Sequence, residues 1–254
     1  MQDTNKGDRM HHVKRKPDFT MLSFAKPISC LSWAPLGGGR RNGIRFVVNR
    51  TLPKNDLRPL PVLQADTEQF IAERGMRLPE TVAMLTTASQ KFLGCSIARN
   101  NKGLLMVALC TVGLGNAVAP GDHAAYDEER GQTPSSSGTI NIILTLNRNL
   151  TENAALELMH TMAMAKASIM VELGLVNRHG QLKLATGTDC QVLCWDQDHE
   201  ITLAYAGMHT RLAELAAGAV RKAMLESMAK RLGAEYSNDS ELLRLARSRF
   251  TATR

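Results

Sequence analysis

The residue types best suited to chemistry gather where two strand-like runs end. The runs span residues 104–112 and 140–146, and they contain Val, Leu, Ile and Thr without charge or proline, as buried strands do. Beside them stand Gly113, Gly115 and Asn116, whose small size lets a ligand approach the main chain. Buried strands that end in small polar residues often carry the site of an α/β protein. The alternative is a pair of ordinary turns, which is the better interpretation for any single glycine.

Segments of this kind recur along the chain, and none of them is rich in charge. They are residues 37–42, 86–89, 113–122 together with 138–141, and 186–189. Hydroxyls, carboxamides and bare backbone suit a ligand with neutral amides and carbonyls better than a phosphate or a polyanion. A Ser or Thr hydroxyl beside a base is a usable nucleophile for amide cleavage, with backbone N–H groups for the oxyanion. The segments therefore favour an amide-bearing ligand.

Two loop carboxylates are the candidate general bases. Asp189 follows Thr188 directly before an apolar strand, and Asp122 follows Gly121. Either carboxylate would take the proton of an attacking water or hydroxyl. Each has a structural alternative, because Asp122 would close an Asx-turn and the Thr188–Asp189 pair would only form a turn before a strand.

Two imidazoles, one amine and one thiol are the remaining candidates for chemistry. His209 and His123 are possible acids or bases, although His209 stands beside Thr210 and is equally well explained as the start of a helix. Lys166 falls one position from an apolar helix stripe, where a lysine usually extends its head to solvent. Cys110 is the weakest candidate nucleophile, because an apolar strand raises the pKa of a thiol.

The composition is typical of a cytosolic protein with an aliphatic core. Of 254 residues, 44% are apolar but only 4% are aromatic, and 13 Met fill gaps. No run of about 18 apolar residues exists, and the polar N-terminus does not have the form of a signal peptide. The five Cys are an odd number without metal-ligand spacing, which indicates reduced thiols. We therefore expect a cytoplasmic protein without membrane span, metal or other cofactor.

The net charge of +7 lies mostly at the two ends of the chain. Residues 1–20 carry five Lys or Arg against three Asp, and residues 221–254 carry eight against four acidic residues. No basic stripe is interleaved with aromatic residues, so solvated segments explain the charge better than nucleic-acid binding. We expect residues 1–20 to be a disordered basic tail and residues 21–254 to form one domain.

Apolar periodicity and turn residues predict the order of strands and helices. Strands are expected at 27–35, 43–49, 81–87, 92–99, 104–114, 140–146, 190–195 and 201–205, and helices at 66–75, 151–173, 210–228 and 238–250. Hairpins dominate, with one over residues 28–49 and another joining 190–195 to 201–205. Residues 120–138 form a long polar segment of the kind that often acts as a lid. The predicted fold is α/β of the α+β type, a single domain whose mixed, largely antiparallel sheet is covered by helices.

Several sequence blocks together resemble the adenosylcobinamide amidohydrolase (CbiZ) family. The blocks are LSWAPLGGG with Asn49, then AMLTTAS, TVGLGNAVAPGD, GTINIILTL, AMAKA with ELG, ATGTD and YAGMHT, in the order of the family. The resemblance covers about residues 27–228 and implies hydrolysis of the amide that joins aminopropanol to a propionate of the corrin ring. The products would be adenosylcobyric acid and 1-aminopropan-2-ol, in prokaryotic salvage of corrinoids for coenzyme B12 synthesis. Two departures are Met164, where the family commonly has Glu, and a shortened block at Thr188 and Asp189.

A corrinoid is a flat ring with many neutral amide arms, which agrees with loops rich in Gly, Thr and Asn. We expect these loops to line one cleft. The expected catalytic residues are Asp189, Asp122, Thr188 and Lys166. The expected substrate-binding residues are Asn49, Thr87, Gly113, Asn116, Thr139, Asn141, Thr186, Gly187 and His209. The backbone after Gly113 or Gly187 would hold the oxyanion.

Two mechanisms and two other classes of function stay open at this point. The attack on the amide would come either from water or from Thr188 or Thr87 through an acyl-enzyme. The chain would alternatively be an amidase for another substrate, such as a self-cleaving N-terminal-nucleophile type, or a corrinoid-binding protein without turnover. The expected partner is a small corrinoid, with no nucleic acid, and homo-oligomer formation is left open.

Overall fold

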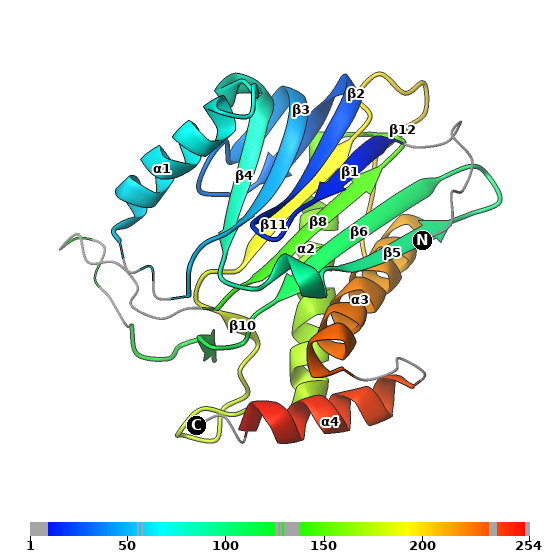
Figure 1. The fold of residues 1–254 in the computed structure, drawn as a ribbon. Coiled ribbons are helices and arrows are strands. Elements are labelled where there is room, and N and C mark those ends of the chain that lie inside the picture. The colour runs from blue at the N-terminus through cyan, green and yellow to red at the C-terminus, as the bar shows by residue number, and fades with distance from the viewer. Residues whose placement is uncertain are drawn as a thin grey trace.

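One mixed sheet organises the molecule (Figure 1). The computed structural model describes residues 10–54, 56, 58–124, 127, 129, 138–233 and 238–251. The strand order of the sheet is β4 (Thr81–Thr86), β3 (Gly39–Thr51), β2 (Phe19–Ser32), β11 (Cys190–Trp195), β8 (Ile140–Leu146), β6 (Leu105–Val112) and β5 (Gly94–Arg99). Only the β3–β4 and β8–β11 pairs of this series are parallel. The mixed, mostly antiparallel sheet confirms the predicted fold class.

Short pairs connect loops outside this sheet. β7 (Ala117–Val118) pairs with β10 (Ala185–Thr186), and β9 (Asn149–Leu150) pairs with β12 (Thr202–Leu203). The first pair ties the loop after β6 to the loop before β11. It therefore brings together two of the polar segments that the sequence marks as site candidates.

Four helices lie in the described part of the chain. They are α1 (Leu60–Ala72), α2 (Glu152–Leu173), α3 (Arg211–Leu232) and α4 (Asp239–Thr251), with short 3-10 turns at Leu78–Glu80 and Gln90–Phe92. The Thr151 hydroxyl accepts a hydrogen bond from the backbone N–H of Ala154, and Gly174 ends α2 in the left-handed conformation at φ 61°. Among the described residues, no helix is both long and apolar enough to cross a membrane.

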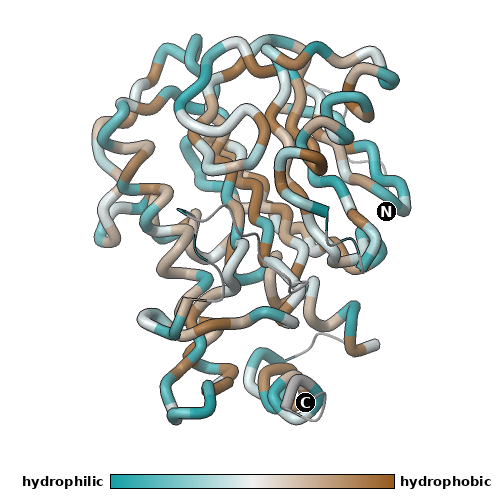
Figure 2. The backbone as a smooth tube through the Cα atoms, turned by 90° about the vertical axis from the view of Figure 1, so that its left-hand side faces the viewer, coloured by the Kyte–Doolittle hydropathy of each residue, from teal (hydrophilic) through white to brown (hydrophobic). Residues whose placement is uncertain are grey.

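The sheet bends so that its two halves pack face to face. The β2–β3 register shifts between Ser23 and Ile28, which marks the bend. Side chains from β2, β3 and β4 then share one core with Leu109 of β6, Ile143 of β8 and Val192 of β11. Helices α2 and α3 cover the other face of β6, β8 and β11, and α4 packs on α2 and α3 (Figure 1). Helix α1 packs on the outer face of β3 and β4. Figure 2 shows the hydrophobic stretches along the central strands.

The structure corrects three expectations about elements. Residues 11–15, expected to be disordered, form β1 (His11–Arg15), because this segment pairs with the edge of β2 and the His11 ring packs on Phe24. Helix α1 begins at Leu60 rather than near residue 66, since a proline is tolerated in the first turn. β12 pairs with β9 and not with β11, because both edges of β11 are already taken by β2 and β8. Residues 1–9 and most of the expected lid at 120–138 lie outside the described residues.

Candidate active site

Three of the predicted polar segments meet at one end of the sheet, which we call the site end. Here β6 finishes at Val112, while β8 and β11 begin, with Asn141 beside Cys190 in register. The backbone N–H of Gly113 donates to the carbonyl of Thr139 over 2.9 Å. The hydroxyl of Thr139 in turn donates to the carbonyl of Thr188 over 2.6 Å. Segments 113–122, 138–141 and 186–189 therefore form one contiguous surface.

A buried ion pair lies at the centre of this surface. Lys166 reaches from α2 to a carboxylate oxygen of Asp189, and their side chains are only 9% and 8% exposed. The other Asp189 oxygen accepts hydrogen bonds from the Thr186 hydroxyl and, over 3.2 Å, from the Ile140 N–H. The structural alternative for Lys166, a side chain that extends to solvent, is wrong, because its ammonium group meets this carboxylate. Burial of such a pair needs good geometry and further hydrogen bonds to offset desolvation, and both are present here.

An exposed hydroxyl stands next to the ion pair. The Thr188 hydroxyl donates to the carbonyl of Gly138 over 2.9 Å, and it lies 3.3 Å from the side-chain nitrogen of Asn116. The Asn116 side chain is 9% exposed, and its oxygen has no hydrogen-bond partner among the described residues. Such an unsatisfied acceptor is uncommon inside a folded protein. The side-chain oxygen of Asn116 can therefore still accept a hydrogen bond, directly beside Thr188.

A chain of side-chain amides extends from this surface into the core between the two halves of the sheet. The Asn141 amide donates to the side-chain oxygen of Asn49 over 2.8 Å and to the carbonyl of Leu85 over 3.0 Å. Asn49 donates to the Thr111 hydroxyl over 3.0 Å. The bend of the sheet makes this contact, since it carries the ends of β3 and β4 over the start of β8. Thr87 directly follows β4 and is half-buried.

Two of the expected catalytic or binding side chains lie outside the cluster. Both oxygens of Asp122 are occupied, one by the backbone N–H of Ala119 over 2.8 Å and the other by the side chain of Asn177. The N–H of Ala119, followed by the Asn177 amide, holds the pKa of Asp122 below its ordinary value. His209 directly precedes Thr210, the capping residue of α3, beyond the opposite end of β11. These placements match the turn and helix-start alternatives.

The histidine and cysteine candidates offer little chemistry. The exposed His123 ring contacts only the neighbouring carbonyl of Ala124 in the described part of the chain. Burial raises the pKa of the Cys110 thiol well above its ordinary value, and the Asp189 charge adds to this. Burial likewise raises the pKa of Cys190. Over the described residues, no group of three or more His, Cys, Asp or Glu side chains is arranged to hold a metal ion.

The N–H groups of Gly113 and Gly187 are themselves engaged, whereas the oxyanion was expected to bind the backbone that follows them. Gly113 donates its N–H to Thr139, and Gly187 donates its N–H to the carbonyl of Asn116 over 3.2 Å. The N–H groups of Gly115 and Asn116 differ, because no backbone acceptor is assigned to either within the described residues. Gly138 lies against them, since a Cβ placed on it would be 2.7 Å from the nitrogen of Gly115 and 3.0 Å from that of Asn116.

Sequence reasoning missed Trp33 at this site. The residue directly follows β2, and its indole N–H donates to the carbonyl of Asp189 over 2.8 Å. A usable signal was present, because an aromatic residue stands between the end of a strand and the glycine-rich loop that begins at Gly37. Thr111 was also missed. It lies on β6, and its hydroxyl faces the chain of amides, where it accepts a hydrogen bond from Asn49.

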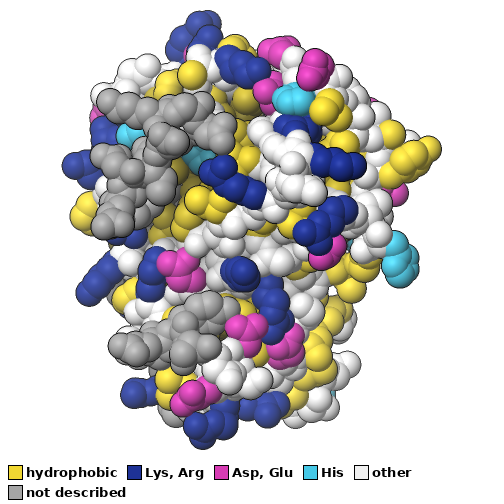
Figure 3. Space-filling view, turned by 90° about the vertical axis from the view of Figure 1, so that its right-hand side faces the viewer, with side chains coloured by type: hydrophobic (Ala, Val, Ile, Leu, Met, Phe, Trp, Pro, Cys, Tyr) yellow, Lys and Arg dark blue, Asp and Glu magenta, His cyan; other side chains and the backbone are white. Residues whose placement is uncertain are grey.

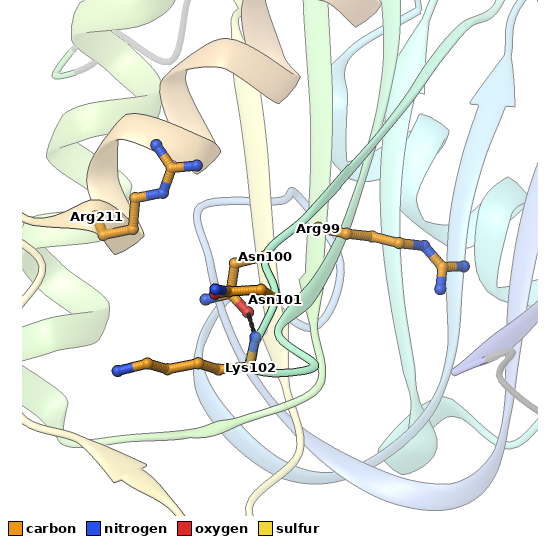
Figure 4. Close-up of a pocket in the computed structure, with 5 residues that line it drawn as sticks. All are labelled: Arg99, Asn100, Asn101, Lys102 and Arg211. Carbon is orange, nitrogen blue, oxygen red and sulfur yellow. Dashed lines mark hydrogen bonds between the residues drawn. The ribbon is translucent and has the colours of Figure 1, made fainter.

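A hollow of about 500 Å³ lies elsewhere, at the opposite end of the sheet. Its lining residues are Arg99, Asn100, Asn101, Lys102 and Arg211. Figure 4 shows that the Arg99 side chain extends away from those of Lys102 and Arg211, so the cations do not converge on one point. We therefore place the candidate active site at the site end and not in this hollow.

Comparison with known proteins agrees with the chemistry of the site end. The model of the adenosylcobinamide amidohydrolase (CbiZ) family matches residues 1–236. The uncharacterized protein MJ1613 of Methanocaldococcus jannaschii is 26% identical over 200 residues, covering 74% of this chain and 78% of the relative. Two solved structures are more distant.

The PH0078 protein of Pyrococcus horikoshii has a TM-score of 0.44 at 11% identity, covering 94% of this chain and 91% of its own. A β-aminopeptidase of Burkholderia has a TM-score of 0.40 at 12% identity, covering 95% and 90%. The family match spans most of the chain. The protein therefore belongs to the adenosylcobinamide amidohydrolase family and is a hydrolase of amide carbon–nitrogen bonds.

Proposed function

We propose that this chain hydrolyses the amide between aminopropanol and the corrin propionate of adenosylcobinamide, releasing adenosylcobyric acid and 1-aminopropan-2-ol. The reaction would serve the salvage of incomplete corrinoids for coenzyme B12 synthesis. The observation that carries the proposal is the buried Lys166–Asp189 pair, whose polar neighbours in the cluster are neutral hydroxyls and amides. Neutral donors and acceptors match the amide arms of a corrinoid, and the one carboxylate supplies a base.

In this proposal Asp189 is the general base. Its carboxylate already accepts a hydrogen bond from the Thr186 hydroxyl, and this supports a base that can take a proton from an oxygen in that position. The attacking oxygen forms a bond to the amide carbon and gives its proton to Asp189. The proton then passes to the nitrogen of aminopropanol as the carbon–nitrogen bond breaks. Lys166 holds the carboxylate in position through the ion pair.

The substrate's carbonyl oxygen needs donors, and the N–H groups of Gly115 and Asn116 are the ones we assign to it. Gly115 is exposed, so a substrate can approach it from solvent. The absence of a side chain at Gly138 keeps the two nitrogens uncovered. Thr188 presents its exposed hydroxyl on the same side, next to Asn116. Preorganised N–H groups of this kind stabilise the negative charge that develops on the oxygen.

The decisive experiment incubates the pure protein with adenosylcobinamide. We expect a new corrinoid that bears one more carboxylate, together with one equivalent of 1-aminopropan-2-ol, both identified by mass spectrometry. D189N is the matched control and should produce neither compound above background. Tight binding of adenosylcobinamide without release of aminopropanol would overturn the proposal in favour of a corrinoid-binding protein.

The same reaction distinguishes the two modes of attack. Acid quenching during turnover, followed by peptide mass analysis, would reveal a corrinoid ester on the peptide that contains Thr186 and Thr188 if an acyl-enzyme forms. Direct attack by water predicts an unmodified peptide at every time point. The T186V and T188V variants then identify the hydroxyl, because only the acylated residue is required for the adduct.

A further inference from the structure

Trp33 is the most conspicuous group at the site end that the proposed chemistry does not use. It is a large aromatic side chain, yet 50% of it is exposed. The chain has one other tryptophan, Trp195, which is only 1% exposed in the core beneath the helices. An indole left half in water gives up much of the hydrophobic stabilisation that burial provides. An exposed aromatic residue in this position therefore points to a ligand.

The exposed indole is held in one orientation. Its N–H is tied to the carbonyl of Asp189, and the next residue, Ala34, donates its backbone N–H to the Ser32 hydroxyl over 2.8 Å. Ser32 before it and Ala34 after it are both buried, so the segment is anchored on both sides of Trp33. A rigid aromatic face pays little conformational entropy on binding, which is why such residues recur in recognition surfaces.

The indole is also connected to the reacting groups. The Asp189 residue whose carbonyl holds Trp33 is the one whose carboxylate meets Lys166. A ligand that lies on the indole is therefore held at a fixed distance from this carboxylate, because Asp189 itself holds the indole. A planar conjugated ring fits an indole face, and neutral amide arms at its edge fit the Thr and Asn groups beside it.

We propose that Trp33 is the platform on which the planar ring of the substrate stacks, so that one amide arm reaches Asp189. This inference rests on the proposed function and specifies how the site selects a macrocyclic substrate. Trp33 is a positioning residue, and its contribution appears in binding of the ring rather than in the bond-breaking step.

The test compares W33L, W33A and W33F with the wild-type protein. Loss of a stacked aromatic should raise the KM for adenosylcobinamide about tenfold or more in W33L and W33A, while kcat changes less than about threefold. The Kd for cobyric acid, measured by calorimetry, should rise in parallel. W33F keeps a flat face without the N–H and should retain most of the affinity. Y205A is the matched control, because Tyr205 is 73% exposed beyond the other end of β11.

Two results would overturn the inference while the proposed function stands. An unchanged KM in W33L and W33A would show that the ring does not stack on Trp33. A loss of kcat at constant KM, equal in W33F and W33L, would show that only the N–H tether matters. A change of sedimentation coefficient in W33A, with normal kinetics, would instead identify Trp33 as a protein contact. If the wild-type protein neither binds nor hydrolyses a corrinoid, the proposed function itself fails.

Discussion

The two ends of the sheet are both polar, but they are built in different ways. At the site end, buried side chains bind one another as well as the backbone: Lys166 meets Asp189, and Asn141 meets both Asn49 and the carbonyl of Leu85. At the other end, which we call the hairpin end, β5 turns into β6 and β8 finishes. There Arg148 donates to the backbone carbonyls of Lys102 and Asn147, over 2.7 and 2.8 Å.

This difference indicates which polar groups serve the fold and which serve a ligand. A side chain that satisfies backbone groups fixes a loop, and its loss is felt as lost stability. Side chains that bind one another in a buried network impose a geometry that no loop requires. Such a network also leaves hydrogen-bonding groups free for a substrate, such as the side-chain oxygen of Asn116. Surface charge does not distinguish the two ends of the sheet on the face shown in Figure 3, because basic and acidic side chains are interspersed over it.

The ion pair provides the largest test of this comparison. D189N or K166M alone would leave a buried partner without compensation, so each should lower the free energy of unfolding by about 3–5 kcal/mol. Loss of the general base should also reduce kcat of D189N by about 10²- to 10⁴-fold. Urea unfolding and steady-state kinetics measure the two effects.

The double variant K166M/D189N separates stability from chemistry. Without a buried charge it should regain most of the unfolding free energy, yet remain as inactive as D189N. A stable double variant with wild-type activity would mean that the pair only supports the fold, and that the two ends of the sheet do not differ in kind.

The next effect in size concerns the backbone nitrogens at the site end. In G138A the new Cβ would lie against the N–H groups of Gly115 and Asn116, so kcat should fall about 10²-fold with a smaller change in KM. G121A is the control, since Gly121 also has a positive φ, of 83°, but a Cβ there meets nothing within 4 Å. Equal losses in both variants would show that backbone strain, and not covered donors, explains the effect.

The sequence predicted the parts of this site that depend on local chemistry. Thr151 and Gly174 define α2 through capping preferences that act within a few residues, and the uncharged run at β8 reads as a buried strand. The small polar residues at the ends of such strands were sufficient to predict that Thr139, Thr188 and Asp189 lie close together.

The parts that escaped prediction depend on the bend and on strand order. Asn49 and Asn141 are 92 positions apart, and they meet only because the sheet folds over itself. The burial of Lys166 depends on Asp189 arriving opposite α2, which no helical periodicity encodes. The partners of Asp122 also escaped prediction, because the residues around Gly121 do not indicate that its oxygens bind the Ala119 N–H and Asn177.

At the hairpin end the comparison predicts that mutations lower the stability of the fold and leave the activity unchanged. R148M would leave the carbonyls of Lys102 and Asn147 without their charged donor, so the free energy of unfolding should fall by about 2–3 kcal/mol. Its kcat should remain within about twofold of the wild type, because no reacting group is touched. H209A should change neither quantity, as expected for an exposed residue before a helix cap. A tenfold loss of kcat in either variant would return the hairpin end to consideration as part of the site.

The smallest expected effect belongs to Asp122, a carboxylate bonded to backbone near the site end. D122N should keep kcat within about threefold, because no hydrogen bond joins Asp122 to the ion pair in the described part of the chain. Its pKa is held below the ordinary 3.8, mainly by the N–H of Ala119, so its contribution to stability is complete above about pH 4. That contribution is lost as the pH falls through the lowered pKa. Wild type and D122N should therefore differ in urea midpoint at pH 7 and converge near pH 2, whereas a base in the reaction would give D122N a large loss of kcat at pH 7.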